Sequence, residues 1–328
     1  MKKVMVTGAT GHVGNVLIKE LNKQGYQVYG LVLPFDRIDY IKNDCHIVYG
    51  NILDLAGLKY LFREMDYIIH TAGLIDIGSG NKKNLYNVNI NGTLNVMKAA
   101  LFSNVKRVVY TSSVHAIPEI KNDQTMTEID YFDPKKVKGN YAKSKAIATQ
   151  SAFDYAKDHN LDLVVVMLSG VIGAHDYKGS YMGEVVKSYL RNKLPVYIKG
   201  GYNFVDVKDV SKGIVLALEN GIKHENYILS GYVKTIKKYL DLIAAYTHKK
   251  PIKKAINYYF ILIMSKFAEL YYIINKKKML MSTYSIKVLR SNPNFSNQKA
   301  ISQLGWQLRP FEETVKDVVD FIRSEYNL

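Results

Sequence analysis

The sequence predicts an α/β fold, a doubly wound and mostly parallel sheet followed by a smaller, mainly helical C-terminal lobe. Two observations predict it. Strand and helix patterns alternate through the first half of the chain, which favours parallel strands joined by helices. After about residue 170 the pattern becomes irregular and then mostly helical. We expect domains at 1–170 and 171–328, with some elements of the second returning to the core of the first.

The opening segment predicts a strand, a tight turn and a helix. An apolar run at 4–7 is followed by glycines at 8, 11 and 14, and then by an amphipathic pattern at 16–21. Glycines let the backbone approach a ligand, and the helix N-terminus faces a pyrophosphate. In this strand-to-helix context the pattern indicates a Rossmann dinucleotide site rather than a turn that simply needs glycine.

The remaining elements of the first half follow from periodicity. We expect strands at 27–33, 46–49, 67–72, 107–111, 161–168 and 227–229, and helices at 55–63, 84–102 and 141–158. The run 161–168 is nearly all apolar, as in a strand covered on both faces. The ligand is expected outside the C-terminal ends of the parallel strands.

Composition narrows the class of protein. The net charge of +16 comes without a nucleic-acid motif, which favours a solvated basic surface and no nucleic-acid partner. A single cysteine, Cys45, excludes an internal disulfide. With no signal peptide ahead of the first strand, we expect a cytoplasmic protein. The histidines are dispersed, so no metal site is predicted.

Large apolar residues are concentrated at 256–274, where Lys266 and Glu269 interrupt the run. The segment therefore falls short of a spanning helix. We interpret it as a helical hairpin that packs on the lobe and lines an apolar substrate pocket. The alternative is an interfacial helix that contacts a membrane surface.

Tyr141 and Lys145 stand at i and i+4, which places them on one face of a helix. A phenol ordinarily keeps its proton at neutral pH, with a reference pKa of about 10. A nearby ammonium, together with a cationic nicotinamide ring, favours the phenolate and suits it to acid/base work. A serine from the Thr111-Ser112-Ser113 strand end can hold a substrate oxygen.

With these residues in view, the chain resembles the extended short-chain dehydrogenase/reductase family over essentially its whole length. The closest likeness is to the dihydroflavonol-reductase-like and 3β-hydroxysteroid-dehydrogenase-like branch of the NAD-dependent epimerase/dehydratases. The matching segments are the glycine turn and residues 70–73, 88–93, 111–113, 141–145, 169–173, 204–210, 289–292 and 304–306. The resemblance implies a catalytic set of Ser113, Tyr141 and Lys145, with Asn89 in support.

The resemblance also implies a nicotinamide dinucleotide cofactor. Its expected contacts are Gly8, Thr10, Gly11, His12, Val13, Gly14, Arg37, Asn51, Ile52, Thr71, Ala72, Gly73, Ser112, Tyr141, Lys145, Leu168, Gly170 and Val171. Ser112 is expected beside the nicotinamide. The choice between NAD and NADP stays open, because Asp36 favours a free ribose hydroxyl and Arg37 favours a 2′-phosphate.

Two departures from the family pattern narrow the reaction. Val114-His115-Ala116 stands where dehydratases carry an acidic pair, which disfavours dehydration. Met167-Leu168 replaces the usual Arg-Pro, so a nucleotide-sugar diphosphate lacks its guanidinium.

We therefore expect an NAD(P)-dependent oxidoreductase that acts on a carbonyl or secondary alcohol of a fairly apolar small molecule. The alternatives are a nucleotide-sugar epimerase with tightly bound NAD and a non-catalytic dinucleotide-sensing scaffold. Family members often pair through the helices near 85–103 and 141–158, and we expect a homodimer here.

Overall fold

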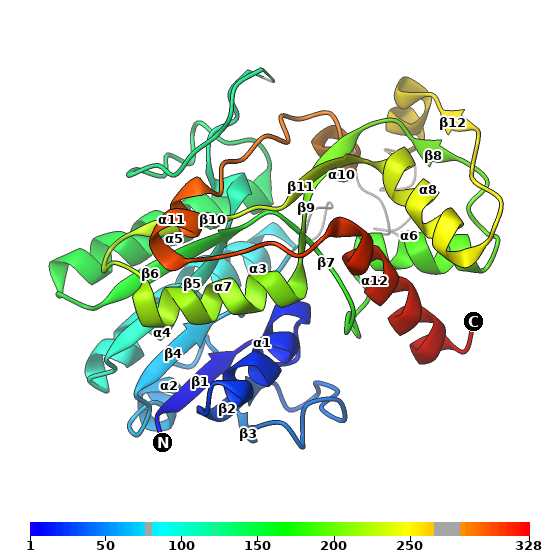
Figure 1. Cartoon of the computed structure of the whole chain (residues 1–328). Helices are drawn as coiled ribbons and strands as arrows, with labels where there is room; N and C mark the ends of the chain where they lie inside the picture. Colours follow the sequence, from blue (N-terminus) through cyan, green and yellow to red (C-terminus); the bar gives the residue numbers. More distant parts are fainter. Residues whose placement is uncertain (76–80, 122, 266–282) are drawn as a thin grey trace.

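A parallel sheet forms the centre of the larger domain in the computed structural model, which describes residues 1–75, 81–121, 123–265 and 283–328 (Figure 1). Seven strands lie in the order β10-β6-β5-β4-β1-β2-β3, and every neighbouring pair is parallel. This is the doubly wound Rossmann sheet that the sequence predicts. Its strands are β1 (Lys3–Thr7), β2 (Gln27–Val32), β3 (His46–Tyr49), β4 (Tyr67–His70), β5 (Arg107–Ser113), β6 (Leu163–Leu168) and β10 (Asn226–Leu229).

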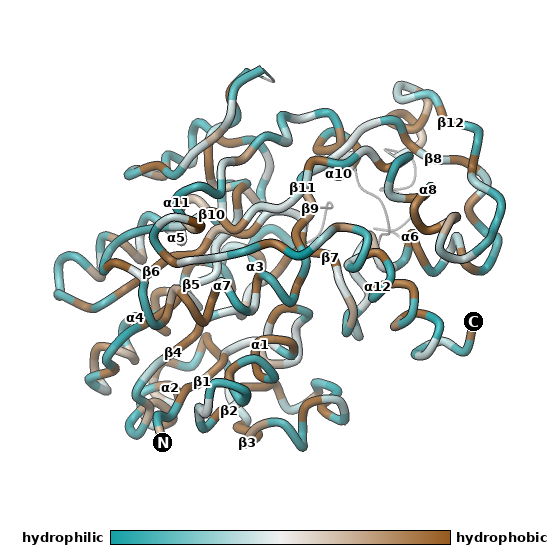
Figure 2. Tube along the Cα trace, in the orientation of Figure 1, coloured by the Kyte–Doolittle hydropathy of each residue, from teal (hydrophilic) through white to brown (hydrophobic). Residues whose placement is uncertain are grey.

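Helices cover both faces of this sheet and create two hydrophobic cores. One face is covered by α2 (Leu55–Leu61), α4 (Thr93–Phe102) and α5 (Asn140–Asp158). The other is covered by α1 (His12–Lys23), α7 (Val207–Asn220) and α11 (Gln298–Leu304). Burial on both faces explains the continuous apolar runs in the strands, which are brown along the sheet in Figure 2. The carboxyl ends of all seven strands share one edge.

The expected long helix at 84–102 is divided in the structure. It consists of α3 (Lys82–Tyr86), a π-helical turn η1 (Asn87–Gly92) and α4. The side chain of Asn89, inside this turn, is held by groups outside the helix. At its end, a Cβ on Gly92 would lie 2.6 Å from Cδ1 of Ile52. Periodicity cannot distinguish such a turn from regular helix, and single π turns often occur at functional sites.

The smaller lobe is built on a third hydrophobic core and two short sheets. The first sheet has the order β11-β9-β7 and the second pairs β12 with β8. Helices α6 (Tyr181–Leu190), α8 (Ile236–Thr247) and α12 (Phe311–Tyr326) supply most of the core. The strands are β7 (Gly170–Ile172), β8 (Tyr197–Ile198), β9 (Gly201–Asp206), β11 (Tyr232–Thr235) and β12 (Ala255–Ile256). The described chain also contains the short helices η2 (Val114–Ala116) and α10 (Thr283–Val288).

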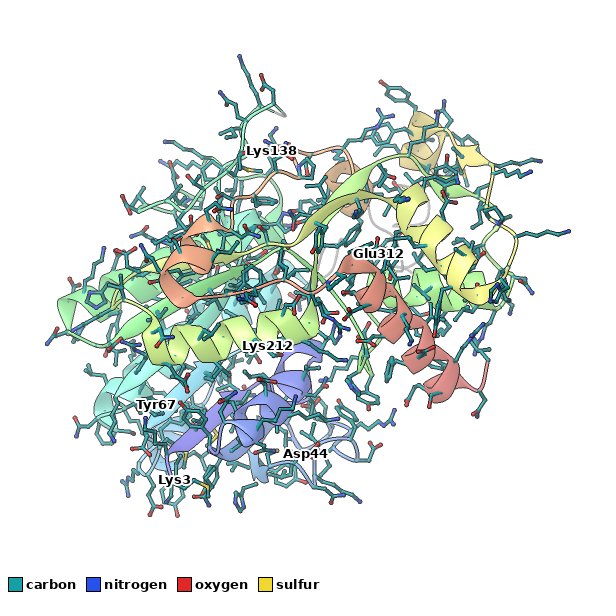
Figure 3. The ribbon with its side chains drawn as sticks, viewed as in Figure 1. Lys3, Asp44, Tyr67, Lys138, Lys212 and Glu312 are labelled. Carbon is teal, nitrogen blue, oxygen red and sulfur yellow. The ribbon has the colours of Figure 1, made fainter. Side chains whose placement is uncertain are left out.

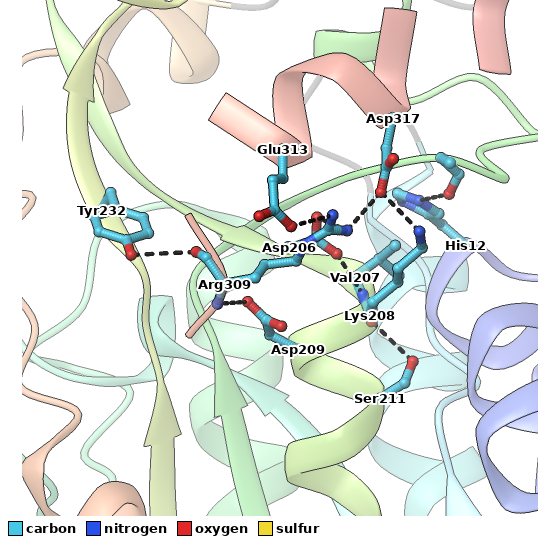
Figure 4. A network of polar contacts seen from close by, with 11 residues as sticks. His12, Asp206, Val207, Lys208, Asp209, Ser211, Tyr232, Arg309, Glu313 and Asp317 are labelled. Atoms are coloured by element: carbon cyan, nitrogen blue, oxygen red, sulfur yellow. Dashed lines mark hydrogen bonds and ion pairs between the residues drawn. The ribbon is translucent and has the colours of Figure 1, made fainter. Parts of the chain in front are cut away.

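Arg309 links the two parts of the molecule through charged contacts (Figure 4). Its guanidinium bonds Asp206 at the start of α7 at 3.4 Å, and also bonds Asp317 and Glu313 on α12. Lys208 on α7 bonds the same Asp317 at 2.7 Å. The network connects a helix of the Rossmann domain with a helix of the lobe, so it fixes the lobe above the carboxyl edge of the sheet.

The apolar segment at 256–274 falls only partly within the described chain. Ile256 is in β12 and not in a helix, and residues 258–265 are helical. The rest of the expected hairpin lies outside the described residues, up to 282. Among the helices that the structure describes, none is both long and apolar enough to span a bilayer. Charged side chains such as Lys138, Lys212 and Glu312 lie exposed on the surface (Figure 3).

Candidate active site

The glycine-rich turn packs against the sheet edge too closely for any side chain. Gly8 has a φ of +72°, and a Cβ there would lie 2.7 Å from Cα of Ala72. A Cβ on Gly14 would lie 2.3 Å from the carbonyl oxygen of Gly8. Helix α1 then begins after Gly11 with no side-chain cap and no acidic residue in its first turn. The first N–H groups of a helix lack intrahelical partners and favour an anion, so this end of α1 suits the pyrophosphate of a dinucleotide.

Asp36 follows the end of β2 and lies beside Thr10 of the glycine turn. The Asp36 carboxylate accepts hydrogen bonds from Thr10 Oγ1 at 2.8 Å and from the amide of Leu33 at 3.2 Å. Lys178 from the lobe bonds both Thr10 and Asp36. Burial alone would raise the pKa of Asp36, but the bonds from Thr10 and Lys178 hold it below its usual value. An ionised carboxylate therefore faces the turn where the adenosine ribose is expected.

Arg37 does not join Asp36 at the turn. Its guanidinium binds both carboxylate oxygens of Asp39, at 2.7 and 2.9 Å, and Glu325 at 3.2 Å. It also lies over the rings of Tyr40 and Tyr177, with 5.5 and 5.6 Å to their centroids. The guanidinium of Arg37, which would favour a 2′-phosphate, is thus held on the outer surface by Asp39 and Glu325.

The ends of β4 and β3 form the next part of the candidate cofactor site. Thr71 Oγ1 donates to the carbonyl of Thr7 at 2.7 Å, which holds the segment from Thr71 to Gly73 against β1. Asn51 is exposed, and its Oδ1 accepts from the amide of Leu53 at 2.9 Å. Ile52 is buried against Gly92. The backbone of 71–73 lies beside the glycine turn, whereas the side chain of Asn51 is occupied by its own loop.

The amine of Lys145 is buried between β5 and the segment that follows β4. Its Nζ donates to the carbonyl of Thr111 at 3.0 Å and to the hydroxyl of Tyr110 at 3.3 Å. A Cβ on Gly73 would lie 3.5 Å from this nitrogen. Burial lowers the pKa of Lys145, and the charge of an ionised Tyr141 opposes that shift. Tyr141 and Lys145 therefore interact electrostatically across one turn of α5.

The two serines at the end of β5 point to different partners, as alternation along a strand requires. Ser112 Oγ is 2.6 Å from Thr149 Oγ1, buried between the sheet and α5. Its side chain thus faces Thr149, and the place beside the nicotinamide that the family resemblance implies for Ser112 stays a prediction. Ser113 accepts the amide of His115 at 3.3 Å, and the ring of His115 meets the Tyr141 ring edge-on with 6.0 Å between centroids. His115 therefore contacts Ser113 through its backbone and Tyr141 through its ring.

Asn89 fixes the backbone that surrounds Lys145. Its Oδ1 accepts from the amide of Leu74 at 2.8 Å. Its Nδ2 donates to the carbonyl of Leu74 and to Ser144 Oγ, both at 3.0 Å. Ser144 is the residue just before Lys145 on α5. Asn89 therefore joins the end of β4 to the helix that carries the Tyr and Lys.

The connection after β6 closes the site from the lobe side. Leu168 ends β6, and Gly170 begins β7, where a Cβ would lie 2.6 Å from the ring of Tyr202. Val171 packs on the core between the sheet and α7. Ser169 Oγ is buried with no hydrogen-bond partner among the described residues. His12 Nε2 lies 2.9 Å from the carbonyl of Ala174, which joins this segment to α1 next to Val13.

Sequence reasoning missed the aromatic part of the site. Tyr110 lies under Lys145. His115 lies edge-on to Tyr141 and is itself contacted by Tyr202 and Tyr284. The alternation of side chains along β5 predicts the position of Tyr110, because residue 110 lies on the same face of the strand as Ser112, toward α5. Tyr202 and Tyr284 arrive from the lobe by tertiary packing and leave no local signal. Across the described ranges there is no group of three His, Cys, Asp or Glu side chains that would hold a metal.

Comparisons with known proteins agree with this architecture. The NAD dependent epimerase/dehydratase family matches residues 4–230. A protein of Synechocystis sp. that is named after dihydroflavonol 4-reductase is 35% identical over 239 residues, which cover 69% of each chain. Cinnamoyl-CoA reductase 1 of Oryza sativa subsp. japonica is 30% identical over 248 residues, which cover 70% of this chain and 71% of the relative.

Solved structures share the fold over the full length. The crystal structure of gox2253 superposes with a TM-score of 0.86 at 25% identity and covers 99% of both chains. WbmH of Bordetella bronchiseptica, solved in complex with NAD⁺, has a TM-score of 0.77 at 23% identity over 100% of both chains. The chain thus belongs to the NAD dependent epimerase/dehydratase family of extended short-chain dehydrogenases/reductases, and its cofactor is NAD or NADP.

Proposed function

We propose that this protein is an NAD(P)-dependent reductase that transfers a hydride between nicotinamide and a carbonyl or secondary alcohol. The observation that supports this most is the buried Lys145 ammonium, which interacts with Tyr141 at the carboxyl edge of the sheet, beside a glycine turn built for a dinucleotide. A buried cation next to a phenol is costly to keep unless its charge is used. Two sequence relatives with 30% identity or more, from Synechocystis sp. and Oryza sativa, carry the names of reductases.

The cofactor would be held by the turn at 8–14, by Asp36 and by the backbone of 71–73. When bound, it supplies or accepts the hydride. In the reductive direction Tyr141 donates its proton to the carbonyl oxygen of the substrate, and in the oxidative direction its phenolate takes that proton back. Ser113 donates a hydrogen bond to the same oxygen and stabilises its developing charge. The ammonium of Lys145 stabilises the phenolate, and Asn89 positions the helix that carries both residues.

The test is turnover of NADH or NADPH with a panel of ketones and aldehydes, followed by absorbance of the reduced nicotinamide. We expect Tyr141→Phe to lower kcat by about 10²- to 10⁴-fold, because the proton donor is lost while the ring remains. Binding of NADH, measured by fluorescence titration, should stay within about twofold of wild type, since the phenol oxygen is a minor part of the cofactor site.

Tyr155→Phe is the matched control, because Tyr155 lies on the same helix and stacks on His159 instead of facing the site. It should turn over like the wild type. Full activity in Tyr141→Phe would refute the acid/base role. A change in the stereochemistry of a UDP-sugar, with no net oxidation of NADH, would point to epimerisation instead, against which Met167-Leu168 already argues.

A further inference from the structure

A histidine enclosed by tyrosines lies next to Tyr141 and has no part in the proton transfer described above. His115 is in η2, two residues after Ser113. Its ring is nearly parallel to that of Tyr202 on β9, at 5.8 Å, and is tilted against that of Tyr284 on α10, at 6.0 Å. The edge-on contact with Tyr141 completes the cluster. Four elements from both parts of the molecule therefore converge on one imidazole.

Tyr202, His115 and Tyr284 form a hydrogen-bonded chain with the imidazole of His115 in the middle. Tyr202 Oη is 2.8 Å from His115 Nε2, and Tyr284 Oη is 3.4 Å from His115 Nδ1. Burial lowers the pKa of His115 to about 4 and raises the pKa of each of the two phenols well above its usual value. All three groups are therefore neutral at physiological pH.

Neutrality determines what the chain can bind. A neutral imidazole has one N–H and one lone pair, so it donates to one phenol and accepts from the other. The phenol that receives the imidazole N–H keeps its own proton for a further partner. In either tautomer one end of the chain is thus a hydrogen-bond donor that the cluster itself does not use. The tautomer can follow the ligand, so the donor can be presented by Tyr202 or by Tyr284.

Within the described chain, the groups of this cluster offer no cation to a phosphate-bearing molecule such as the UDP-glucose in one neighbouring structure. Its own three residues carry no charge, and the charged group that acts on Tyr284 is the acidic Glu119. The ammonium of Lys145 already donates hydrogen bonds to Thr111 and Tyr110. A diphosphate or other anion therefore meets no cation from these residues, whereas an uncharged hydroxyl or carbonyl meets a donor and two aromatic faces.

We propose that His115, Tyr202 and Tyr284 are specificity-determining residues that bind a second oxygen of an uncharged substrate, in addition to the carbonyl held at Tyr141. This proposal rests on the proposed reductase function and deepens it. The substrate class is a neutral ketone or aldehyde that carries a further hydroxyl or carbonyl group. A site that must pair buried polar groups discriminates strongly against an analogue that lacks the matching oxygen.

The experiment compares acetophenone with 2-hydroxyacetophenone, 2′-hydroxyacetophenone and 4′-hydroxyacetophenone as substrates of the full-length protein. We expect at least one hydroxylated ketone to exceed acetophenone in kcat/KM by about tenfold or more. In His115→Phe that ratio should fall to within about twofold of one, mainly through the KM of the hydroxylated ketone. The ratio is informative even if the variant loses overall activity, because both substrates are measured on the same protein.

Two further variants and a control complete the design. His115→Gln retains a donor and an acceptor and should recover part of the preference. Tyr202→Phe and Tyr284→Phe should each lower it. His159→Phe is the matched control, because His159 is an exposed histidine at the end of α5 whose ring stacks on Tyr155 and bonds the carbonyl of that residue. It should leave the ratio unchanged.

The outcomes separate this proposal from the function on which it rests. Reduction of acetophenone with no preference for any hydroxylated ketone would overturn the specificity role and leave the reductase function standing. A preference that survives in His115→Phe would do the same. An absence of NADH- or NADPH-dependent turnover with every carbonyl compound tested would overturn the reductase function and, with it, this proposal.

Discussion

Tyr110 is the residue whose importance the structure reveals most clearly. Its hydroxyl accepts from Lys145 Nζ, and the same ammonium lies 5.0 Å from the centroid of its ring. Burial raises the pKa of Tyr110 to about 12, so the phenol is neutral and free to accept. Among the residues that the structure describes, the carbonyl of Thr111 is the other hydrogen-bond acceptor of this ammonium. We infer that Tyr110 is a positioning residue for Lys145, to which the proposed function gives a catalytic role.

Tyr110→Phe should destabilise the protein by about 1–3 kcal/mol. The substitution retains the ring but removes an oxygen that a buried cation uses, and bonds to charged groups are the costly ones to lose. The free energy of unfolding in urea measures this directly. Tyr155→Phe, half-buried and remote from Lys145, should stay within about 0.5 kcal/mol of wild type. Equal stabilities for the two variants would show that Lys145 does not depend on Tyr110.

Cofactor choice is also decided by single residues. Asp36 faces Thr10 and the glycine turn, and Arg37 is bound by Asp39 and Glu325. A carboxylate accepts ribose hydroxyls and repels a 2′-phosphate. We therefore expect kcat/KM for NADH to exceed that for NADPH by about tenfold or more, and Asp36→Asn to reduce this preference. Asp44→Asn, in the same connection between β2 and β3, is the control. Equal use of both cofactors by the wild type would contradict this assignment.

Among the elements, η1 shows why a local feature escapes prediction. The helical periodicity at 84–102 is real, and α3, η1 and α4 all lie within or next to that range. The wider turn at 87–92 accompanies the attachment of Asn89 to Leu74 and Ser144, which are far away in the sequence. The pattern of residues along a helix does not show where such a turn occurs.

Asn89→Ala should destabilise the protein by about 2–3 kcal/mol, because both backbone groups of Leu74 and the hydroxyl of Ser144 lose a buried partner. Urea unfolding measures the free energy, and hydrogen exchange at the Leu74 amide reports the local loss. Asn91→Ala is the matched control from the same turn, since Asn91 is exposed and bonds only Asn87. If both variants lost the same stability, the turn itself and not the Asn89 contacts would account for the effect.

The elements that sequence did predict share a physical property. Strands β1, β4, β5 and β6 are almost wholly buried and have apolar runs, so their positions follow from hydrophobicity within a few residues. The glycine turn could likewise be predicted from the sequence, because only glycine fits at positions 8 and 14. Tyr202 and Tyr284 were not predictable in this way. Their place beside Tyr141 depends on how the lobe folds back over the sheet, which no local pattern encodes.

At the scale of the whole molecule, the contacts between the lobe and the Rossmann domain include aspartate side chains whose pKa values are shifted. The Arg309 amide donates to Asp209 on α7 at 2.9 Å, and Trp306 donates to the carbonyl of the same residue at 2.7 Å. Burial raises the pKa of Asp209 to about 6, and the bond from Arg309 offsets this only in part. Asp317 differs, because its bonds from Lys208 and Arg309 outweigh burial and lower its pKa.

These opposite shifts predict opposite pH dependences of stability. An unfolded aspartate titrates near pH 4, so between about pH 4 and 6 the native state holds a proton on Asp209 that the unfolded chain has lost. The free energy of unfolding that Asp209 contributes therefore falls as pH rises through this window, and stays low above it. For Asp317 the native state holds fewer protons, so its contribution is present at neutral pH and is lost as pH falls below about 4.

Asp209→Asn isolates the first effect, because its amide oxygen can still accept from Arg309 while carrying no charge. We expect the variant to be more stable than wild type by about 1–3 kcal/mol at pH 7, and to lose this advantage as pH falls from 6 to 4. Asp317→Asn should be less stable than wild type at pH 7, because Lys208 and Arg309 then lose their shared anion. Urea unfolding of the three proteins at pH 4, 5, 6 and 7 gives the differences. An Asp209→Asn variant that is less stable than wild type at pH 7 would contradict this prediction. It would mean that the charged carboxylate stabilises the contact between α7 and the lobe by more than its burial destabilises the native state.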